Sequence, residues 1–227
     1  LARLERACNA IGLTSNRTEW EEDIQLALAK SEAGRYVIKL VLTRGSSGFG
    51  YTPGDGKATR ILQLLAYPKS NEQELKCEIL ESELGSNRHL AGHKHLNRLE
   101  QVMAAREVSD RGLQEGLVCD EHGFLVEAVS SNVVLAFDNR IVTPLIQSAG
   151  VKGVMRDVLI ENTRNTDIRI FEELVFRDVI AEADEIILCN SVRGVRRVAR
   201  LGERALKANA VYLRLKQLAE KALEATD

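Results

Sequence analysis

Residues 89–97, HLAGHKHLN, place three of the four histidines of this 227-residue chain around one lysine. Two kinds of chemistry fit such a cluster: His89, His93 and His95 could bind a metal ion, or Lys94 could be the reactive group. In a strand His93 and His95 share one face, whereas in a helix His89 and His93 share one. Neither geometry aims all three imidazoles at one point, and no acidic residue nearby completes a ligand set, so the sequence disfavours a metal site.

Lys94 directly precedes a helical pattern and follows the small residues Ala91 and Gly92. A lysine that enters an apolar pocket loses solvation, and this loss lowers the pKa of its amine. The neutral amine is a nucleophile for carbonyl carbons. A solvated surface charge is the alternative interpretation of a lysine taken by itself.

Glu127 is an acidic residue inside an apolar strand pattern, with Val126 and Ala128 beside it. A carboxylate in such a place needs a cationic partner, because an unpaired buried charge is costly. The partner can be a structural counter-ion, which is the more frequent case. It can also be the protonated ring nitrogen of a bound cofactor.

Two glycines, Gly150 and Gly153, flank the predicted start of a helix in SAGVKGVMR. Backbone N–H groups at a helix start, together with the helix dipole, can hold a phosphate. Asn190 and Ser191 follow a strand in LCNSVRG and offer a second set of phosphate contacts. The spacing matches neither a dinucleotide-binding fingerprint nor a P-loop, so each glycine is by itself a weak signal.

The elements that must position these residues follow from the spacing of apolar side chains. Thr18 and Glu21 have the spacing of a capping box at the start of a helix. Leu96, Leu99 and Met103 recur at helical spacing. In order, the sequence predicts helices at 1–11 and 18–31, strands at 35–45 and 58–68 around a Gly-rich turn, a strand at 74–81, a helix at 96–107, short strands over 116–144, a helix entered from 150, a strand at 167–172, a helix to about 183, a strand at 185–191, and a long helix from about 203 to 222.

The apolar pattern lapses at Pro68 and the following KSNE, which predicts a linker. The sequence therefore predicts two domains, residues 1–70 and residues 71–227. Their mixture of helices and strands indicates a two-domain α+β protein with mixed sheets. The chain opens on Leu1 inside an amphipathic pattern, so we expect a preceding segment that this sequence does not contain.

Composition narrows the class of protein. The net charge of −2 and the 28% of charged residues are typical of a soluble globular chain, and they favour neither nucleic acid nor an anionic membrane as a partner. No apolar run is long enough to span a bilayer. The four cysteines are scattered without a CxxC pair, which predicts reduced, buried thiols and a cytoplasmic location. They are Cys8, Cys77, Cys119 and Cys189.

Taken together, the motifs resemble the class IV pyridoxal-phosphate enzymes, which include branched-chain and D-amino-acid aminotransferases. HLAGHKHLNRLEQV, FLVEAVSSN, GVKGVMR and LCNSVRGV occur in the family's order and at its separations. The lysine segment most resembles the lyases of this family that act on aminodeoxychorismate, and the resemblance covers essentially the whole chain. It implies a smaller N-terminal α/β domain, truncated at its start, a larger C-terminal mixed-sheet, barrel-like domain that binds pyridoxal 5′-phosphate, and a homodimer.

The resemblance also assigns two central roles. Lys94 matches the lysine that forms a Schiff base with the cofactor and later moves protons. Glu127 matches the acid that faces the pyridine nitrogen and keeps it positive, so that the ring accepts electrons from the substrate.

Four further residues match the family's phosphate ligands. Val154 and Met155 match the helix-start amides, and Ser191 matches a side chain near the phosphate. Arg3 matches the arginine of the family's H-x-x-R-L motif, whose histidine would lie just before Leu1. A cation and a helix N-terminus together suit a dianionic phosphate.

The implied reaction converts 4-amino-4-deoxychorismate to 4-aminobenzoate and pyruvate, a step of folate biosynthesis. The alternative is a class IV aminotransferase acting on D- or branched-chain amino acids, which would use the same Lys94 and Glu127. Phe49 stands where the family often has a second arginine, and Arg44 and Arg88 are the candidates for binding the substrate carboxylates.

Overall fold

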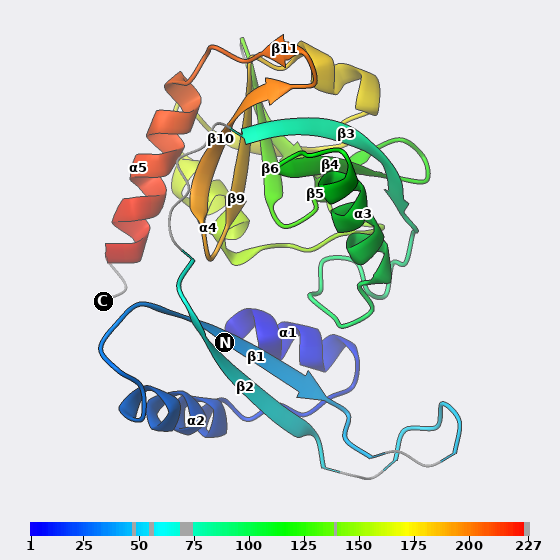
Figure 1. The fold of residues 1–227 in the computed structure, drawn as a ribbon, viewed down its shortest axis with the longest axis vertical. Coiled ribbons are helices and arrows are strands. Elements are labelled where there is room, and N and C mark those ends of the chain that lie inside the picture. The colour runs from blue at the N-terminus through cyan, green and yellow to red at the C-terminus, as the bar shows by residue number, and fades with distance from the viewer. Residues whose placement is uncertain (47–48, 55–56, 69–74, 139, 225–227) are drawn as a thin grey trace. The chain divides into compact units, whose positions relative to one another are not determined.

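A computed structural model describes residues 1–46, 49–54, 57–68, 75–138 and 140–224 (Figure 1). The chain forms two compact units, Leu1–Ser70 and Asn71–Asp227. The predicted linker at residues 69–72 and parts of the predicted Gly-rich turn, at 47–48 and 55–56, lie outside the described residues.

The N-terminal unit consists of two helices and an antiparallel strand pair, in the order that the sequence predicts. Its elements are α1 (Ala2–Ala10), α2 (Arg17–Ala29), β1 (Tyr36–Thr43) and β2 (Thr59–Ala66). The predicted capping box is wrong. The N-cap of α2 is Asn16, whose side chain accepts a hydrogen bond from the Thr18 N–H at 3.0 Å. Asn is at least as good a cap as Thr, so the helix begins two residues earlier than Thr18 would allow.

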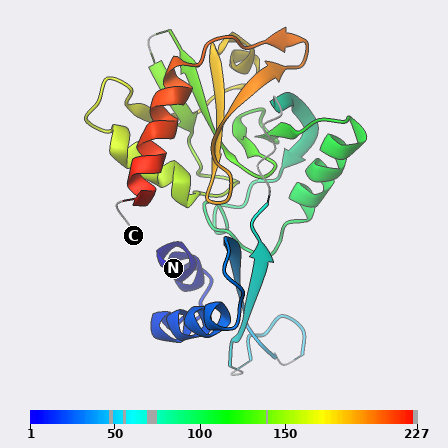
Figure 2. The ribbon, with the colours of Figure 1, turned by 60° about the vertical axis from the view of Figure 1, so that its left-hand side comes forward.

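The C-terminal unit is built on a curled, mixed sheet (Figures 1 and 2). Its described strands follow the order β5-β4-β3-β10-β9-β6-β7-β8, with β11 paired to β10. Strand β3 runs parallel to both β4 and β10, and β7 runs parallel to β8, whereas the other pairs are antiparallel. The bounds are β3 (Leu75–Leu84), β4 (Glu115–Asp120), β5 (Leu125–Ala128), β6 (Asn132–Phe137), β7 (Arg140–Pro144), β8 (Ile170–Glu173), β9 (Glu185–Asn190), β10 (Gly194–Leu201) and β11 (Arg204–Ala205).

Helices cover the sheet at two places. Helices α4 (Val154–Thr163) and α5 (Ala210–Glu224) pack together next to β9 and β10, and α3 (Leu99–Asp110) packs next to β3 and β4 (Figures 1 and 2). Apolar side chains fill the spaces between helices and sheet, because burial of such surface is the main favourable term in folding. Met155 and Leu159 of α4 share one apolar cluster with Ile187 of β9, and Ala104 of α3 shares another with Leu80 of β3 and Val118 of β4.

The predicted C-terminal helix starts too early. Residues 194–201 form strand β10 and Arg204–Ala205 form β11, so that α5 begins only at Ala210. The physical reason is that Gly202 (φ 54°) turns the chain back, so that Arg204 and Ala205 pair antiparallel with Leu201 and Arg200 of β10. The helix predicted before residue 183 is a short 3₁₀ helix, η1 (Arg177–Glu182).

Two further observations concern the whole described chain. No helix within the described ranges is long and apolar enough to cross a membrane. The cysteines are buried single thiols, in agreement with the prediction from their spacing; they are Cys8, Cys77, Cys119 and Cys189.

Candidate active site

The segment that carries Lys94 connects β3 to α3 and is tied to the loop that leads into α4. The Gly92 N–H donates to the carbonyl of Gly150 at 2.9 Å, and the Lys152 N–H donates to the carbonyl of Gly92 at 3.0 Å. Gly92 has φ 81°, a conformation that an L side chain rarely adopts. Lys94 follows this glycine and is exposed on the C-terminal unit.

Glu127 reaches the same loop from β5. Its side chain is buried, and its Oε2 accepts a hydrogen bond from the Val151 N–H at 2.8 Å. Gly150 (φ 81°) makes this approach possible, because a Cβ there would lie 2.4 Å from Val126 Cγ1 and 3.3 Å from Glu127 Oε2. The buried Glu127 side chain therefore binds the backbone of the residues that lead into α4.

Burial dominates the electrostatics of this acid. It raises the pKa of Glu127 above the ordinary value, and the Val151 N–H and the positive charges of Arg98 and Lys94 oppose that rise. Lys94 thus lies close enough to Glu127 to act on its ionisation. The structure brings these two predicted residues together in one unit, and a cation bound near Glu127 would stabilise its charged form.

Helix α4 begins at the two residues predicted to hold a phosphate. Val154 and Met155 are its first residues, and its N-cap, Gly153, provides no side-chain hydrogen bond. Without such a cap, N–H groups of the first turn remain available for an anion. Val154 is exposed, whereas the Met155 side chain is buried against the sheet, so only its backbone can serve an external ligand.

Asn132, at the start of β6, holds the lead-in to α4 in place. Its Nδ2 donates to the carbonyl of Val151 at 2.7 Å, and its Oδ1 accepts from the Gly153 N–H at 3.1 Å. A Cβ on Gly153 would lie 2.2 Å from that Oδ1, so the contact requires glycine. Sequence reasoning missed Asn132, although its place after Ser130 and Ser131 at a strand start is a usable signal.

Ser191 lies exposed in the turn between β9 and β10. Asn190 shapes this turn by accepting from the N–H groups of Val192 and Arg193, at 2.9 and 2.7 Å. Its Nδ2 donates to Ser131 Oγ at 3.1 Å. Since Asn132 is the register partner of Cys189 on β9, the Ser191 turn is at the end of the sheet where Asn132 holds α4.

Arg3 belongs to α1 of the N-terminal unit, so its role as a phosphate ligand stays a prediction. In the same unit the guanidinium of Arg44 donates to the carbonyls of Ile11 and Gly12, which gives Arg44 a structural use. Arg88 lies exposed in the C-terminal unit.

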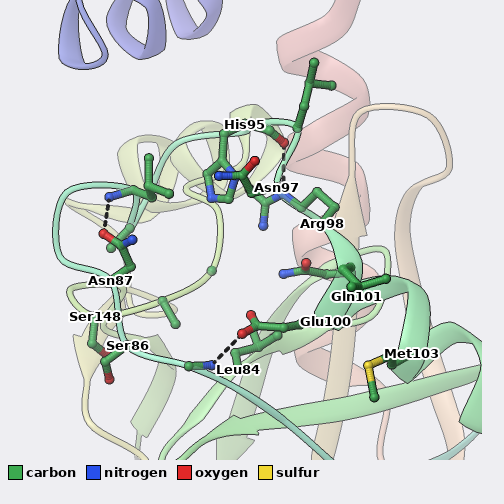
Figure 3. A pocket seen from close by; sticks show the side chains of 17 residues that line it. Leu84, Ser86, Asn87, His95, Asn97, Arg98, Glu100, Gln101, Met103 and Ser148 are labelled. Carbon is green, nitrogen blue, oxygen red and sulfur yellow. Dashed lines mark hydrogen bonds between the residues drawn. The ribbon is translucent and has the colours of Figure 1, made fainter. Parts of the chain in front are cut away.

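A cavity of about 650 Å³ lies beside the lysine segment (Figure 3). It is lined by the end of β3, the residues that flank Lys94, the first turn of α3, and residues 148–150. Two buried atoms on its wall, His95 Nδ1 and Gln101 Oε1, have no hydrogen-bond partner. Burial, followed by the charges of Arg98, His93 and Lys94, lowers the pKa of His95 to about 4, so its imidazole is neutral near pH 7.

The histidines do not converge. Within the described part of the chain, no group of three or more His, Cys, Asp or Glu side chains could hold a metal ion. The groups that the structure brings together are a lysine on a segment bonded to the α4 lead-in, a buried carboxylate bonded to the same lead-in, and a helix start without a side-chain cap.

Comparisons with known proteins agree with this set of groups. A family model described as amino-transferase class IV matches residues 1–201. An aminodeoxychorismate lyase of Vibrio harveyi is 29% identical over 189 residues, a match that covers 81% of this chain and 68% of the relative. A putative branched-chain-amino-acid aminotransferase of Methanocaldococcus jannaschii is 25% identical, and the match covers 81% of this chain and 65% of that relative. The chain thus spans about two thirds of the length of these relatives.

Solved structures share the fold over almost the whole chain. The 4-amino-4-deoxychorismate lyase of Pseudomonas aeruginosa is 34% identical with a TM-score of 0.89, and the match covers 98% of this chain and 84% of that one. An aminotransferase of Brucella abortus, bound to the cofactor pyridoxal phosphate, is 20% identical with a TM-score of 0.84, covering 98% and 82%, a likeness of fold alone.

These matches identify the fold as that of the class IV pyridoxal-phosphate enzymes, with a curled, half-barrel mixed sheet. The family uses pyridoxal 5′-phosphate as its cofactor. The sequence-based prediction of fold, family and cofactor is confirmed. The chain belongs to the class IV aminotransferase family.

Proposed function

We propose that this chain acts as a pyridoxal-phosphate-dependent lyase that converts 4-amino-4-deoxychorismate to 4-aminobenzoate and pyruvate. The observation that carries the proposal is the 34% identity to the Pseudomonas aeruginosa lyase over 98% of this chain. The lysine segment HLAGHKHLNRLEQV supports it, because the motif resembles the lyases of the family more than its aminotransferases.

The residues present fit the cofactor. Pyridoxal phosphate has three groups that a protein can recognise: an aldehyde, a ring nitrogen and a phosphate. Lys94 offers an amine for the aldehyde. Glu127, a carboxylate whose pKa burial raises, is suited to a cationic ring nitrogen. The uncapped start of α4, at Val154 and Met155, is suited to the phosphate.

When bound, the cofactor supplies an electron-withdrawing ring that accepts the electrons released as a proton leaves the substrate. Glu127 would keep the ring nitrogen positive by holding a negative charge in a buried place. Backbone N–H groups of Val154 and Met155, with the Ser191 side chain, would bind the phosphate and fix the ring in the site. Asn132 keeps those amides in position through its bonds to the α4 lead-in.

Lys94 would serve as the proton carrier of the reaction. Its free Nζ would be the base that takes the proton from the substrate ring carbon that bears the nitrogen. The bond between the adjacent ring carbon and the enolpyruvyl oxygen breaks, and the ring becomes aromatic. The leaving group gains a proton to become pyruvate, so substrate and products balance without any oxidant or second substrate.

A single assay separates this lyase from an aminotransferase, the second candidate, which the Methanocaldococcus jannaschii relative favours. The protein is incubated with pyridoxal phosphate and 4-amino-4-deoxychorismate, with no keto acid present. The lyase releases 4-aminobenzoate and pyruvate in equal amounts. A transaminase needs a keto-acid acceptor, so a requirement for one, or turnover of D- or branched-chain amino acids alone, contradicts the proposal.

A different class of protein, a metal-binding or non-catalytic interaction protein that uses HLAGHKH, predicts bound metal and no cofactor absorbance. If the chain is the proposed lyase, the cofactor gives a visible absorbance band. Borohydride treatment should remove this band and leave the mass of the cofactor attached to Lys94. A borohydride-treated sample with no added mass on the Lys94 peptide would reject the covalent role.

We further propose a homodimer in the cytoplasm. Exposed apolar side chains at and before α3 support the assembly, since surface of this kind favours association; they are Leu96, Leu99, Val102 and Met103. Buried single cysteines suit a reducing compartment. Light scattering on a size-exclusion column tests the dimer, and a mass of 25.2 kDa, that of one chain, would contradict it.

A further inference from the structure

Arg98 binds the backbone on both sides of Lys94. Its Nη2 donates to the carbonyl of His93 at 2.6 Å, and its Nε donates to the carbonyl of His95 at 3.1 Å (Figure 3 shows the second bond). These two residues are the immediate neighbours of Lys94 in the chain. One planar guanidinium therefore binds the backbone on both sides of Lys94, at the peptide unit that enters the lysine and at the unit that follows His95.

The surroundings of Arg98 hold its guanidinium in place. Arg98 is half-buried on the wall of the cavity beside the lysine segment, and its backbone forms the N-cap of α3. Burial lowers the pKa of Arg98, whereas the charges of Glu127 and Glu100 raise it. A guanidinium keeps its charge under such opposing influences, because its ordinary pKa lies far above neutral pH.

The far end of the segment is fixed by other bonds. Gly92 pairs with Gly150 and Lys152 through backbone hydrogen bonds, and the same loop is held by Glu127 through Val151. Lys94 thus lies between a backbone bridge on its N-terminal side and the Arg98 side chain on its C-terminal side. Arg98 also carries a positive charge that stabilises the ionised form of Glu127.

We infer that Arg98 is a positioning residue: it fixes the backbone around Lys94 so that the lysine amine is held toward the cofactor site. The inference rests on the proposed function, because it presumes that Lys94 is the cofactor-linked lysine. A lysine side chain has four rotatable bonds, and fixing its backbone reduces the number of directions that the amine samples. Arginine suits this task because its rigid fork reaches two acceptors at once, which a lysine ammonium cannot do with the same geometry.

Two substitutions separate the hydrogen bonds from the charge. Arg98→Lys retains the positive charge and loses the fork, whereas Arg98→Met loses both. Arg106→Lys is the matched control, because Arg106 lies on the same helix but is exposed and forms a surface ion pair with Asp110.

The first readout is hydrogen–deuterium exchange of the cofactor-free protein. We expect faster exchange of the peptide that covers residues 92–98 in Arg98→Lys and Arg98→Met, with β6 and β9 unchanged. The second readout is the rate at which added pyridoxal phosphate becomes fixed on Lys94 by borohydride. The third is turnover: kcat is expected to fall about 10²-fold while KM changes little, since misplacement of a reactive group by about 1 Å costs that much.

The outcomes are distinct. Exchange, cofactor capture and kcat all unchanged in Arg98→Lys would overturn the inference, and so would equal effects in Arg106→Lys. If Arg98→Met fails to fold, Arg98→Lys decides; loss of the fold in both would make Arg98 a general structural residue and overturn the positioning role. If the wild-type protein fixes no cofactor on Lys94, the proposed function fails, while the exchange data still decide whether Arg98 orders the segment.

Discussion

The carboxylate of Glu127 on β5 accepts a hydrogen bond from the backbone N–H of Val151, in the loop that leads into α4, at 2.8 Å. The strand that carries the acid and the helix start that is suited to a phosphate are thereby joined by one contact. Two of the three groups that we propose for cofactor recognition therefore cannot shift independently, and changes at either residue are expected to affect both.

Glu127→Gln is expected to lower kcat by about 10²–10³-fold, the usual loss when a key electrostatic partner is removed. It should also change how the stability of the cofactor-free protein depends on pH. Burial raises the folded-state pKa of Glu127 above the unfolded value, so the folded chain holds this proton more tightly. The free energy of unfolding therefore falls as pH rises from the unfolded pKa through the folded pKa, and glutamine removes this loss.

The check is calorimetry of wild-type and Glu127→Gln protein at pH 5 and pH 8, without cofactor. The Tm difference in favour of the variant should be larger at pH 8. Glu83→Gln, which changes an exposed acid on β3, is the control. A Tm difference that is the same at both pH values would mean that burial does not govern the ionisation of Glu127.

Lys94→Ala is expected to abolish turnover and covalent capture of the cofactor while the fold stays intact, because the proposed mechanism makes Nζ both the point of attachment and the proton carrier. Lys152→Ala is the matched control: Lys152 is an exposed lysine on the neighbouring loop, and its backbone bond to Gly92 is retained. Turnover assays with circular dichroism check the pair, and substantial activity in Lys94→Ala refutes the proposed mechanism.

Asn132→Ala should weaken cofactor affinity and lower stability together. The substitution leaves the Val151 carbonyl and the Gly153 N–H without their present partner, and such a loss costs roughly 1–3 kcal/mol. It also releases the start of α4, so pyridoxal phosphate should bind more weakly in an absorbance titration. Asn162→Ala, on the exposed face of the same helix, is the control. Equal cofactor affinity in the two variants would show that Asn132 does not position the site.

The lowered pKa of His95 should make the folded protein less stable at acidic pH. Its pKa is lowered to about 4 by burial and by the charges of Arg98, His93 and Lys94, so between about pH 6.5 and pH 4 the unfolded chain binds a proton that the folded chain does not. Stability is therefore lost as pH falls through this window. His95→Asn should lose less stability than wild type between pH 7 and pH 4.5 in urea unfolding. His122→Asn, at an exposed histidine, should follow wild type; identical losses in all three proteins would contradict the prediction.

Periodicity predicted most of the elements, because burial on one face governs both helices and strands. Strands β1 and β2, and the helix that begins at Val154, agree with the pattern of apolar residues and glycines. Strand β10 was missed because arginines interrupt its apolar residues: Arg196 and Arg197 break the alternation even though Val195 and Val198 are buried. Only the tertiary pairing with β3 and β9 reveals that segment as a strand.

The sequence predicts the residues that would do the chemistry better than the residues that hold them in place. The motifs predict Lys94 and Glu127 as site residues, and the structure places both in the C-terminal unit. The sequence analysis does not predict the roles of Asn132 and Arg98, because both side chains bind backbone groups. Every residue type except proline has the same backbone donor and acceptor, so the sequence does not identify such partners. The helix predicted from Leu96 begins only at Leu99, since Arg98 uses the preceding carbonyls for its own hydrogen bonds.

The parallel pairing of β3 with β10 has a consequence for biosynthesis. Val198 leaves the ribosome roughly 120 residues after Leu75, its partner across the sheet. Until then β3 and β9 each have one unpaired edge, on the side where β10 will lie. Unpaired edges of a nascent chain are prone to pair with other chains. The sheet that carries the proposed cofactor site is therefore completed late, and a polypeptide stalled before Gly194 should depend on chaperones for protection.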